Sequence, residues 1–200
     1  MRDLLIAICL SCSILACGAG DYPEVGQLNE AEKELLLAAS ELVPMGLPTP
    51  IAPTGEQWRA LTYADGSREL EYLYNTFHTS SQDPVYITTS LSIYPKEKSA
   101  RLMYRAKSAA FAWELNKPLV GLFDENHLER TTISCDYADA CRLTFLVKRD
   151  KRVGSVFYLL KGRYLYIVAM VGWRFLDAEK CHELIRPKVA QFSALDDGDG

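Results

Sequence analysis

Residue patterns that mark common active sites are missing from this sequence. It holds three histidines in 200 residues, and no G-x-S-x-G elbow, H-E-x-x-H pair or glycine-rich phosphate loop occurs. Positive charge is also scarce, since 22 Lys and Arg against 26 Asp and Glu leave a net charge of −4. A basic footprint for nucleic acid is therefore excluded. The sequence predicts no catalytic residues, no metal site, no cofactor and no nucleic-acid partner.

The apolar run at the start of the chain is too short to cross a bilayer. Leu4 to Ala16 contains thirteen mostly apolar residues without charge, whereas a spanning helix needs roughly 20. Such a run, followed by small residues, is typical of the hydrophobic region of a secretory signal. We expect export, into a compartment where disulfides persist.

The end of this run resembles the lipobox of bacterial lipoproteins, with Ile14-Leu15-Ala16 preceding Cys17. The resemblance implies cleavage before Cys17, a diacylglyceryl group on its thiol and an acylated amine, so that fatty (palmitate-type) chains anchor the protein to a lipid bilayer. Gly18 in place of Asp implies the outer membrane, with the body facing the periplasm. Ordinary cleavage after Ala19 or Gly20 and an uncleaved anchor remain open alternatives.

Composition divides the chain into four parts. Residues 1–16 are the expected lipoprotein signal peptide. Residues 17–55 are expected to form a tether with a short helix, capped by Asn29 and Glu32 and running to about Val43, and then a proline-rich linker. Residues 56–195 form a single globular α+β domain, and residues 196–200 a disordered acidic tail.

The pattern of the domain predicts three strands, a long helix, four strands and a final helix. Asp65-Gly66 favours a hairpin near its start, and residues 85–94 alternate as a half-buried strand. The helices are expected over 96–116 and from Asp177 to about Phe192. The last four strands are expected over 130–136, 141–149, 153–161 and 163–172, the final one apolar on both sides and thus covered on both faces.

These elements predict a mainly antiparallel sheet of about six or seven strands with helices on both faces, a helix–sheet–helix sandwich. The element order and the double strand "VGSVFYLLKGRYLYIVAMVG" before a terminal helix resemble the PsbP/Mog1-like fold over roughly residues 56–195. Members of that fold mostly bind partners, so the resemblance implies a binding domain and not a catalyst.

Three cysteines remain after Cys9 and Cys12 leave with the signal and Cys17 takes lipid. Cys135 and Cys141 flank a short turn, and opposite positions on paired strands favour a structural disulfide. A redox or metal pair and two free thiols stay open. We expect Cys181 to be a buried free thiol, because its neighbour His182 points about 100° away on a helix and makes a poor catalytic pair.

Other polar clusters are most simply solvated surface. The acidic loop contains Asp124, Glu125, His127 and Glu129, and His78 lies in another polar loop. The basic hairpin tip Lys148, Arg149, Lys151 and Arg152 has a second interpretation, contact with a protein partner or with lipid phosphates. The tyrosines at 63, 72, 74, 86 and 94 form either core or an exposed aromatic face.

The sequence as a whole predicts a membrane-anchored envelope lipoprotein with a non-enzymatic domain that binds an envelope protein or has a structural role. The alternatives are a periplasmic immunity or inhibitor protein, and a hydrolase or redox enzyme built on Cys181 and His182 or on the acidic loop 124–129.

Overall fold

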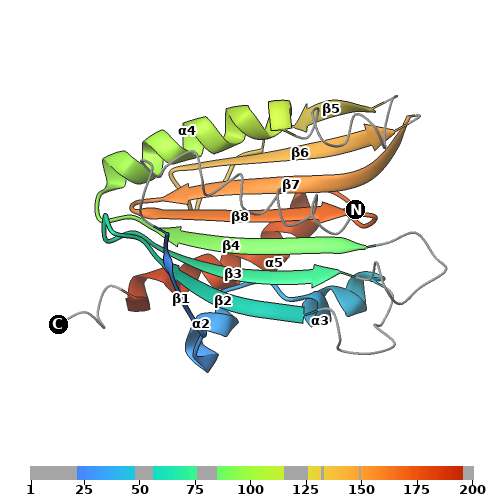
Figure 1. Cartoon of the computed structure of the whole chain (residues 1–200). Coiled ribbons are helices and arrows are strands. Elements are labelled where there is room, and N and C mark those ends of the chain that lie inside the picture. Colours follow the sequence, from blue (N-terminus) through green and yellow to red (C-terminus); the bar gives the residue numbers. More distant parts are fainter. Residues whose placement is uncertain are drawn as a thin grey trace.

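The frame of the protein is an eight-stranded antiparallel sheet (Figure 1). The structure is a computed structural model that describes residues 22–47, 56–75, 85–114, 126–131, 133–148 and 150–195. Across the sheet the strands follow the order β1-β2-β3-β4-β8-β7-β6-β5. In chain order the elements are β1 (Glu24–Gly26), α2 (Glu30–Glu34), α3 (Ala39–Leu42), the 3₁₀ helix η1 (Val43–Met45), β2 (Glu56–Thr62), β3 (Arg68–Asn75), β4 (Tyr86–Ile93), α4 (Glu97–Glu114), β5 (Asn126–Thr131), β6 (Ala140–Lys148), β7 (Lys151–Lys161), β8 (Tyr164–Val171), α5 (Ala178–Ala190) and the 3₁₀ helix η2 (Phe192–Leu195).

The predicted α+β class and the mainly antiparallel sheet are confirmed. The Asp65-Gly66 hairpin joins β2 and β3, with Gly66 at a φ of 80° that favours glycine. Asp65 Oδ1 accepts hydrogen bonds from the backbone N–H and the hydroxyl of Ser67 at 2.9 and 2.6 Å. The strand predicted over 85–94 is β4, and those predicted over 141–149, 153–161 and 163–172 are β6, β7 and β8.

The expected tether over 17–55 is wrong for the part that the structure describes. β1 pairs with β2 and adds an eighth strand to the sheet. Downstream of it, apolar side chains between Leu28 and Leu47 join the main core: Leu28, Leu35, Leu36, Leu37, Leu42 and Leu47. A run of this kind cannot remain in water, because burial of each leucine stabilises by roughly 2 kcal/mol. The domain therefore begins near β1, well before residue 56.

The single helix expected from Asn29 to Val43 is broken in two. The predicted capping box forms, since Asn29 Oδ1 accepts from the Glu32 N–H and Glu32 Oε2 accepts from the Asn29 N–H, both at 2.9 Å. However, α2 ends at Glu34, and α3 begins at Ala39. The apolar residues between the two helices enter the core, where side chains of the sheet take over their backbone hydrogen bonds.

Three sheet side chains hold this break in place. Tyr166 Oη accepts a hydrogen bond from the Leu37 N–H at 2.9 Å, and Thr89 Oγ1 donates to the Leu37 carbonyl at 2.7 Å. Tyr72 Oη accepts from the Ala39 N–H at 2.9 Å. Buried backbone groups need such partners, so the segment is bound to the sheet by polar contacts as well as by its leucines.

Side chains on both sides of β8 are buried, as its apolar alternation predicted. Tyr166 and Val168 belong to the main core cluster together with Ile185 and Val189 of α5. Leu165, which lies between Tyr164 and Tyr166 in the sequence, belongs to a second cluster with Ala100 of α4. In Figure 1, α4 runs along the upper side of the sheet, and α5 is drawn behind the strands.

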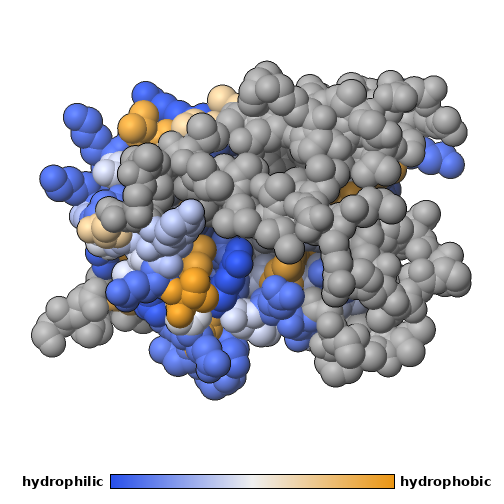
Figure 2. All heavy atoms as spheres, in the orientation of Figure 1, coloured by the Kyte–Doolittle hydropathy of each residue, from blue (hydrophilic) through white to orange (hydrophobic). Residues whose placement is uncertain are grey.

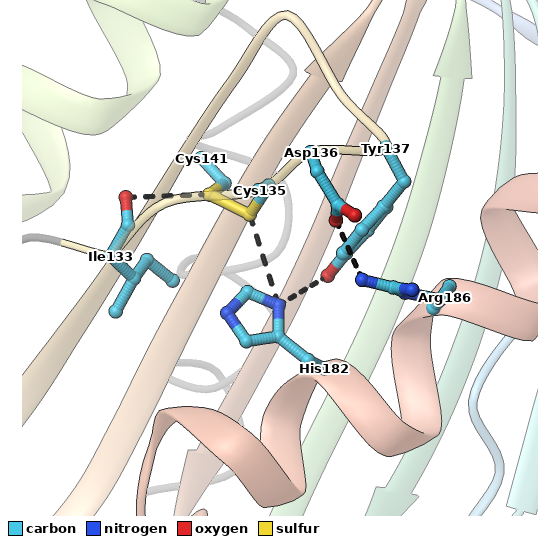
Figure 3. The surroundings of a disulfide bond; sticks show 7 residues. All are labelled: Ile133, Cys135, Asp136, Tyr137, Cys141, His182 and Arg186. Atoms are coloured by element: carbon cyan, nitrogen blue, oxygen red, sulfur yellow. Dashed lines mark hydrogen bonds and ion pairs between the residues drawn. A yellow bond between two sulfur atoms is a disulfide. The ribbon is translucent and has the colours of Figure 1, made fainter.

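One strand differs from its prediction. The pattern over 130–136 suggested a strand, whereas β5 ends at Thr131 and the chain from Ile133 to Asp139 forms a loop with a turn. This loop contains Cys135 and lies beside α5 (Figure 3).

Candidate functional site

The loop between β5 and β6 brings a disulfide, an imidazole and a phenol together. Cys135 and Cys141 form a disulfide with Cα atoms 6.2 Å apart. We expected the two residues to lie opposite each other on paired strands, and this is wrong. Cys135 lies in the loop, and Cys141 lies on β6, where it pairs with Leu159 of β7. The Cys141 sulfur lies 3.7 Å from the Ile133 carbonyl oxygen, at the start of the loop. The disulfide therefore closes the base of the loop.

His182 of α5 points at this disulfide (Figure 3). Its Nδ1 atom lies 2.6 Å from Tyr137 Oη and 3.9 Å from Cys135 Sγ. Burial and the neighbouring charge of Arg186 lower the pKa of His182, against a smaller opposite effect of Asp136. A lowered pKa favours the neutral imidazole near pH 7, and Nδ1 and the Tyr137 hydroxyl share a hydrogen bond.

Tyr137 is enclosed by this arrangement. The rings of Tyr137 and His182 meet edge to face with centroids 5.5 Å apart, and the Arg186 guanidinium lies 5.1 Å from the Tyr137 ring centroid. Arg186 also forms an ion pair with Asp136 at 2.6 Å on the surface. Burial raises the pKa of Tyr137 well above its ordinary value. The group thus ties the loop to α5 and holds its phenol protonated.

Cys181 lies outside this group although it is the neighbour of His182. Its side chain is fully buried in the main core, and it is a free thiol. Burial, then the charge of Asp177, raises the pKa of Cys181 well above its ordinary value. A thiol that stays protonated at pH 7 is a poor nucleophile. Cys181 also points into the core while His182 contacts Tyr137, so the two side chains do not form a catalytic pair.

One residue of the acidic loop meets one residue of the basic hairpin tip. Arg152 forms a two-point ion pair with the Glu129 carboxylate across the sheet, and its guanidinium lies 3.9 Å from the Phe145 ring centroid. One member of each predicted cluster therefore neutralises the other. Lys151 remains exposed at the hairpin tip.

Five predicted site residues lie outside the part of the chain that the structure describes. They are Cys17, His78, Asp124, Glu125 and Arg149. For His127 and Lys148, the structure describes the backbone on β5 and β6 and not the side chain. Within the part described, no group of three or more His, Cys, Asp or Glu side chains is placed to hold a metal ion.

The tyrosines do not form an exposed aromatic face. Tyr72, Tyr74 and Tyr94 are buried, and Tyr63 and Tyr86 are half-buried. Burial raises the pKa of Tyr74, as expected for a phenol that has lost water.

A buried charge network on β3 was not predicted. Glu69 is 6% exposed and accepts hydrogen bonds from Ser92 and Tyr63, and its carboxylate lies 3.4 Å from Lys107 Nζ of α4. Burial alone would raise the pKa of Glu69, but the charge of Lys107 and these hydrogen bonds outweigh it and lower the pKa. Alternation in the printed stretch "RELEYLY" was the available signal, since its two glutamates must share the face opposite Leu70 and Tyr72.

Glu71, the next residue on the same face, completes the network. Its carboxylate pairs with Arg59 of β2. Burial, then the charge of Glu69, raises the pKa of Glu71 against the opposing charge of Arg59. Because each carboxylate faces a cation, the network joins β2, β3 and α4 rather than offering free ligands.

Comparisons with known proteins find little that is similar. No protein-family model matches the chain, and no curated protein matches it. Among solved structures, the extracellular domain of PknH from Mycobacterium tuberculosis is similar over 92% of this chain and 91% of its own, with 7% sequence identity and a TM-score of 0.38. A likeness of this size carries no argument about function. In the part of the chain that the structure describes, no helix is long and apolar enough to cross a bilayer.

Proposed function

We propose that this chain is a bacterial envelope lipoprotein, anchored to the outer membrane through acylated Cys17, whose α+β domain faces the periplasm and binds an envelope protein without catalysing a reaction. The observation that carries the proposal is the start of the fold. β1 begins at Glu24, seven residues after Cys17. Seven extended residues span at most about 25 Å, so an acylated Cys17 would hold the body against the bilayer.

The proposal favours binding over catalysis because the candidate nucleophile and base point apart. Cys181 is buried with a raised pKa, while His182 contacts Tyr137 and the disulfide. Glu129, from the acidic loop, is paired with Arg152. An enzyme needs titratable groups that converge on a pocket, and these side chains do not converge.

The proposal includes the helix–sheet–helix arrangement and its resemblance to the PsbP/Mog1-like fold. Support comes from β7 and β8, where alternate side chains join different clusters. Phe157 and Leu159 belong to the cluster that contains α5, and Leu160 belongs to the one that contains Ala100 of α4. Neighbouring residues of a strand point to opposite faces, which favours α4 and α5 on opposite sides.

Cell fractionation tests the anchor. In a bacterial host, the natural chain should sediment with the envelope and give a mature amino terminus at Cys17 carrying acyl chains. Cys17→Ser should release it, whereas the matched Cys181→Ser variant should fractionate like the natural chain. An unmodified mature terminus at Asp21, or envelope retention of Cys17→Ser, would contradict the proposal.

Crosslinking in intact cells tests the binding role. A reproducible crosslinked protein that survives Cys181→Ser and His182→Gln is expected, because neither residue belongs to a catalytic site in this proposal. If the natural chain showed a hydrolase or redox activity that both Cys181→Ser and His182→Gln abolished without unfolding the protein, the enzyme hypothesis would be favoured over the binding role.

A further inference from the structure

The outer surface of α4 is basic. Lys98, Arg101 and Arg105 recur at intervals of three and four residues, so they lie on one side of the helix, and all three are exposed. Leu102 lies among them and is 66% exposed. These four residues are called here the basic face of α4. Figure 2 shows hydrophobic atoms flanked by hydrophilic side chains over this helix.

The charges of this face are not neutralised within the described residues. None of its three cations forms an ion pair there, whereas Lys107, on the inner side of the same helix, pairs with Glu69. Between residues 96 and 109 the only acidic residue is Glu97. A chain with a net charge of −4 therefore concentrates positive charge on one helix.

The basic face begins near the point where the chain enters the fold. Glu24 at the start of β1 pairs with Thr62, Thr62 pairs with Arg68, and Arg68 pairs with Ile93. Three strand spacings of about 4.8 Å place Glu24 roughly 14 Å from Ile93. Since α4 begins four residues after Ile93, the helix and the entry point share one end of the sheet (Figure 1).

We propose that the basic face of α4 docks on an anionic lipid bilayer. Lys98, Arg101 and Arg105 contact lipid phosphates, and Leu102 inserts its side chain between headgroups. The apolar face of α4 packs on the sheet, so the attraction is that of a basic cluster for anionic lipid headgroups. The proposal rests on the proposed function only in assuming which surface the protein meets, because an anchor at Cys17 reaches about 25 Å from Glu24.

A bilayer fits this face better than an acidic protein does. Protein interfaces are usually centred on large side chains, often Trp or Tyr, that fill pockets of the partner. Here, apart from Glu97, the exposed residues beside the cations are Leu102 and the small residues Ala106 and Ala109. Small side chains let the helix lie close to a flat, charged surface.

Vesicle flotation with the full chain tests the proposal. The natural chain is mixed with phosphatidylcholine vesicles with and without phosphatidylglycerol, and the ratio of the two binding constants is measured at low and high salt. The triple variant Lys98→Gln, Arg101→Gln and Arg105→Gln is compared with a control of equal charge, Lys33→Gln, Arg174→Gln and Lys180→Gln. The apolar run at residues 4–16 is common to all chains, so it cancels from the comparison.

We expect the anionic-to-neutral ratio to fall on the order of 100-fold in the α4 variant, since each Lys or Arg near an anionic surface contributes about fivefold. The control should change little, and the ratio of the natural chain should shrink in high salt. Glutamine is a good helix former, so α4 should be kept, which circular dichroism checks. A second pair, Leu102→Ala against Leu176→Ala, tests the insertion without changing charge, and only Leu102→Ala should weaken binding.

Equal ratios for the α4 variant and its control would overturn the proposal. The proposal would also be overturned if the protein bound immobilised polyglutamate through the α4 cations but did not bind vesicles. That result would identify an acidic protein as the partner. The assay does not involve acylation, so a failure here leaves the anchor at Cys17 to be judged by fractionation.

Discussion

Removing one hydroxyl from the sheet tests whether residues 35–39 belong to the domain. In Tyr166→Phe, the Leu37 N–H loses its acceptor at 2.9 Å while the aromatic ring stays in place. Tyr166 is fully buried, and Leu37 is also 0% exposed, so water cannot replace the lost bond without opening the core. A buried donor left without a partner costs about 1–3 kcal/mol.

The expected loss is thus about 2 kcal/mol in the free energy of unfolding, measured by urea denaturation at pH 7. For a domain of this size, 1 kcal/mol corresponds to about 2–4 °C in Tm. The m value should stay unchanged, because the same surface is exposed on unfolding. Tyr104→Phe is the matched control, since it removes the same hydroxyl from a half-buried tyrosine on α4.

The second step is a double-mutant cycle with Thr89→Val, which removes the donor to the Leu37 carbonyl. Both side chains hold the same peptide segment, so their effects should not add, and the coupling should exceed about 0.5 kcal/mol. If Tyr166→Phe changes stability by no more than the Tyr104→Phe control, residues 35–39 do not pack as the structure has them. A flexible tether over this stretch would give that result.

Three further predictions concern the disulfide loop and the charge network. The double variant Cys135→Ser and Cys141→Ser should lose about 2 kcal/mol of stability, because the bond closes a short loop; a dithiol reductant should lower the Tm of the natural chain and leave that of the variant unchanged. The folded pKa of His182 lies below its ordinary value, so the unfolded chain binds more protons below about pH 6.5, and the free energy of unfolding should fall as the pH is lowered through that value. His182→Gln should flatten this part of the plot of unfolding free energy against pH, and an unaltered slope would contradict the assigned direction of the pKa. Lys107→Met should cost about 3 kcal/mol in thermal or urea unfolding because it leaves Glu69 charged and buried, and adding Glu69→Gln should recover part of that loss; a single variant as stable as the natural chain would show that the pair is not buried.

Local patterns were sufficient for much of the fold. Asp65-Gly66 specified its hairpin, and the alternation over 85–94 specified β4, because turn chemistry and side-chain period depend on neighbouring residues alone. The apolar sequence of β8 likewise predicted burial on both of its sides. The pairing of Cys135 with Cys141 was predicted from their spacing, although the loop geometry that produces it differs from a paired hairpin.

Patterns that depended on distant partners failed. The helix expected from Asn29 to Val43 is interrupted because Tyr72, Thr89 and Tyr166 supply hydrogen bonds from strands far along the chain. Nothing near Leu37 in the sequence signals those partners. For the same reason, the predicted start of the domain at residue 56, after the proline-rich stretch, is wrong, because β1 and the leucines after it already belong to the sheet and core.

The candidate site divides in the same way. Helical geometry predicted that Cys181 and His182 point apart, and the structure agrees, because the thiol lies in the core and His182 contacts the disulfide loop. The meeting of His182 with Tyr137, 45 residues earlier, arises only when α5 packs beside the disulfide loop.

By itself, the sequence determined the class of fold, most of its strands, the signal-like start and the spacing of the cysteines, since these follow from periodicity and composition over short stretches. Only the tertiary structure decided that residues 24–47 complete the sheet and core, and that Arg152 neutralises Glu129. It also decided that three cations of α4 face outward with no ion-pair partner among the described residues. Those outcomes depend on which surfaces meet when hydrophobic burial closes the sheet, and a linear pattern does not contain that information.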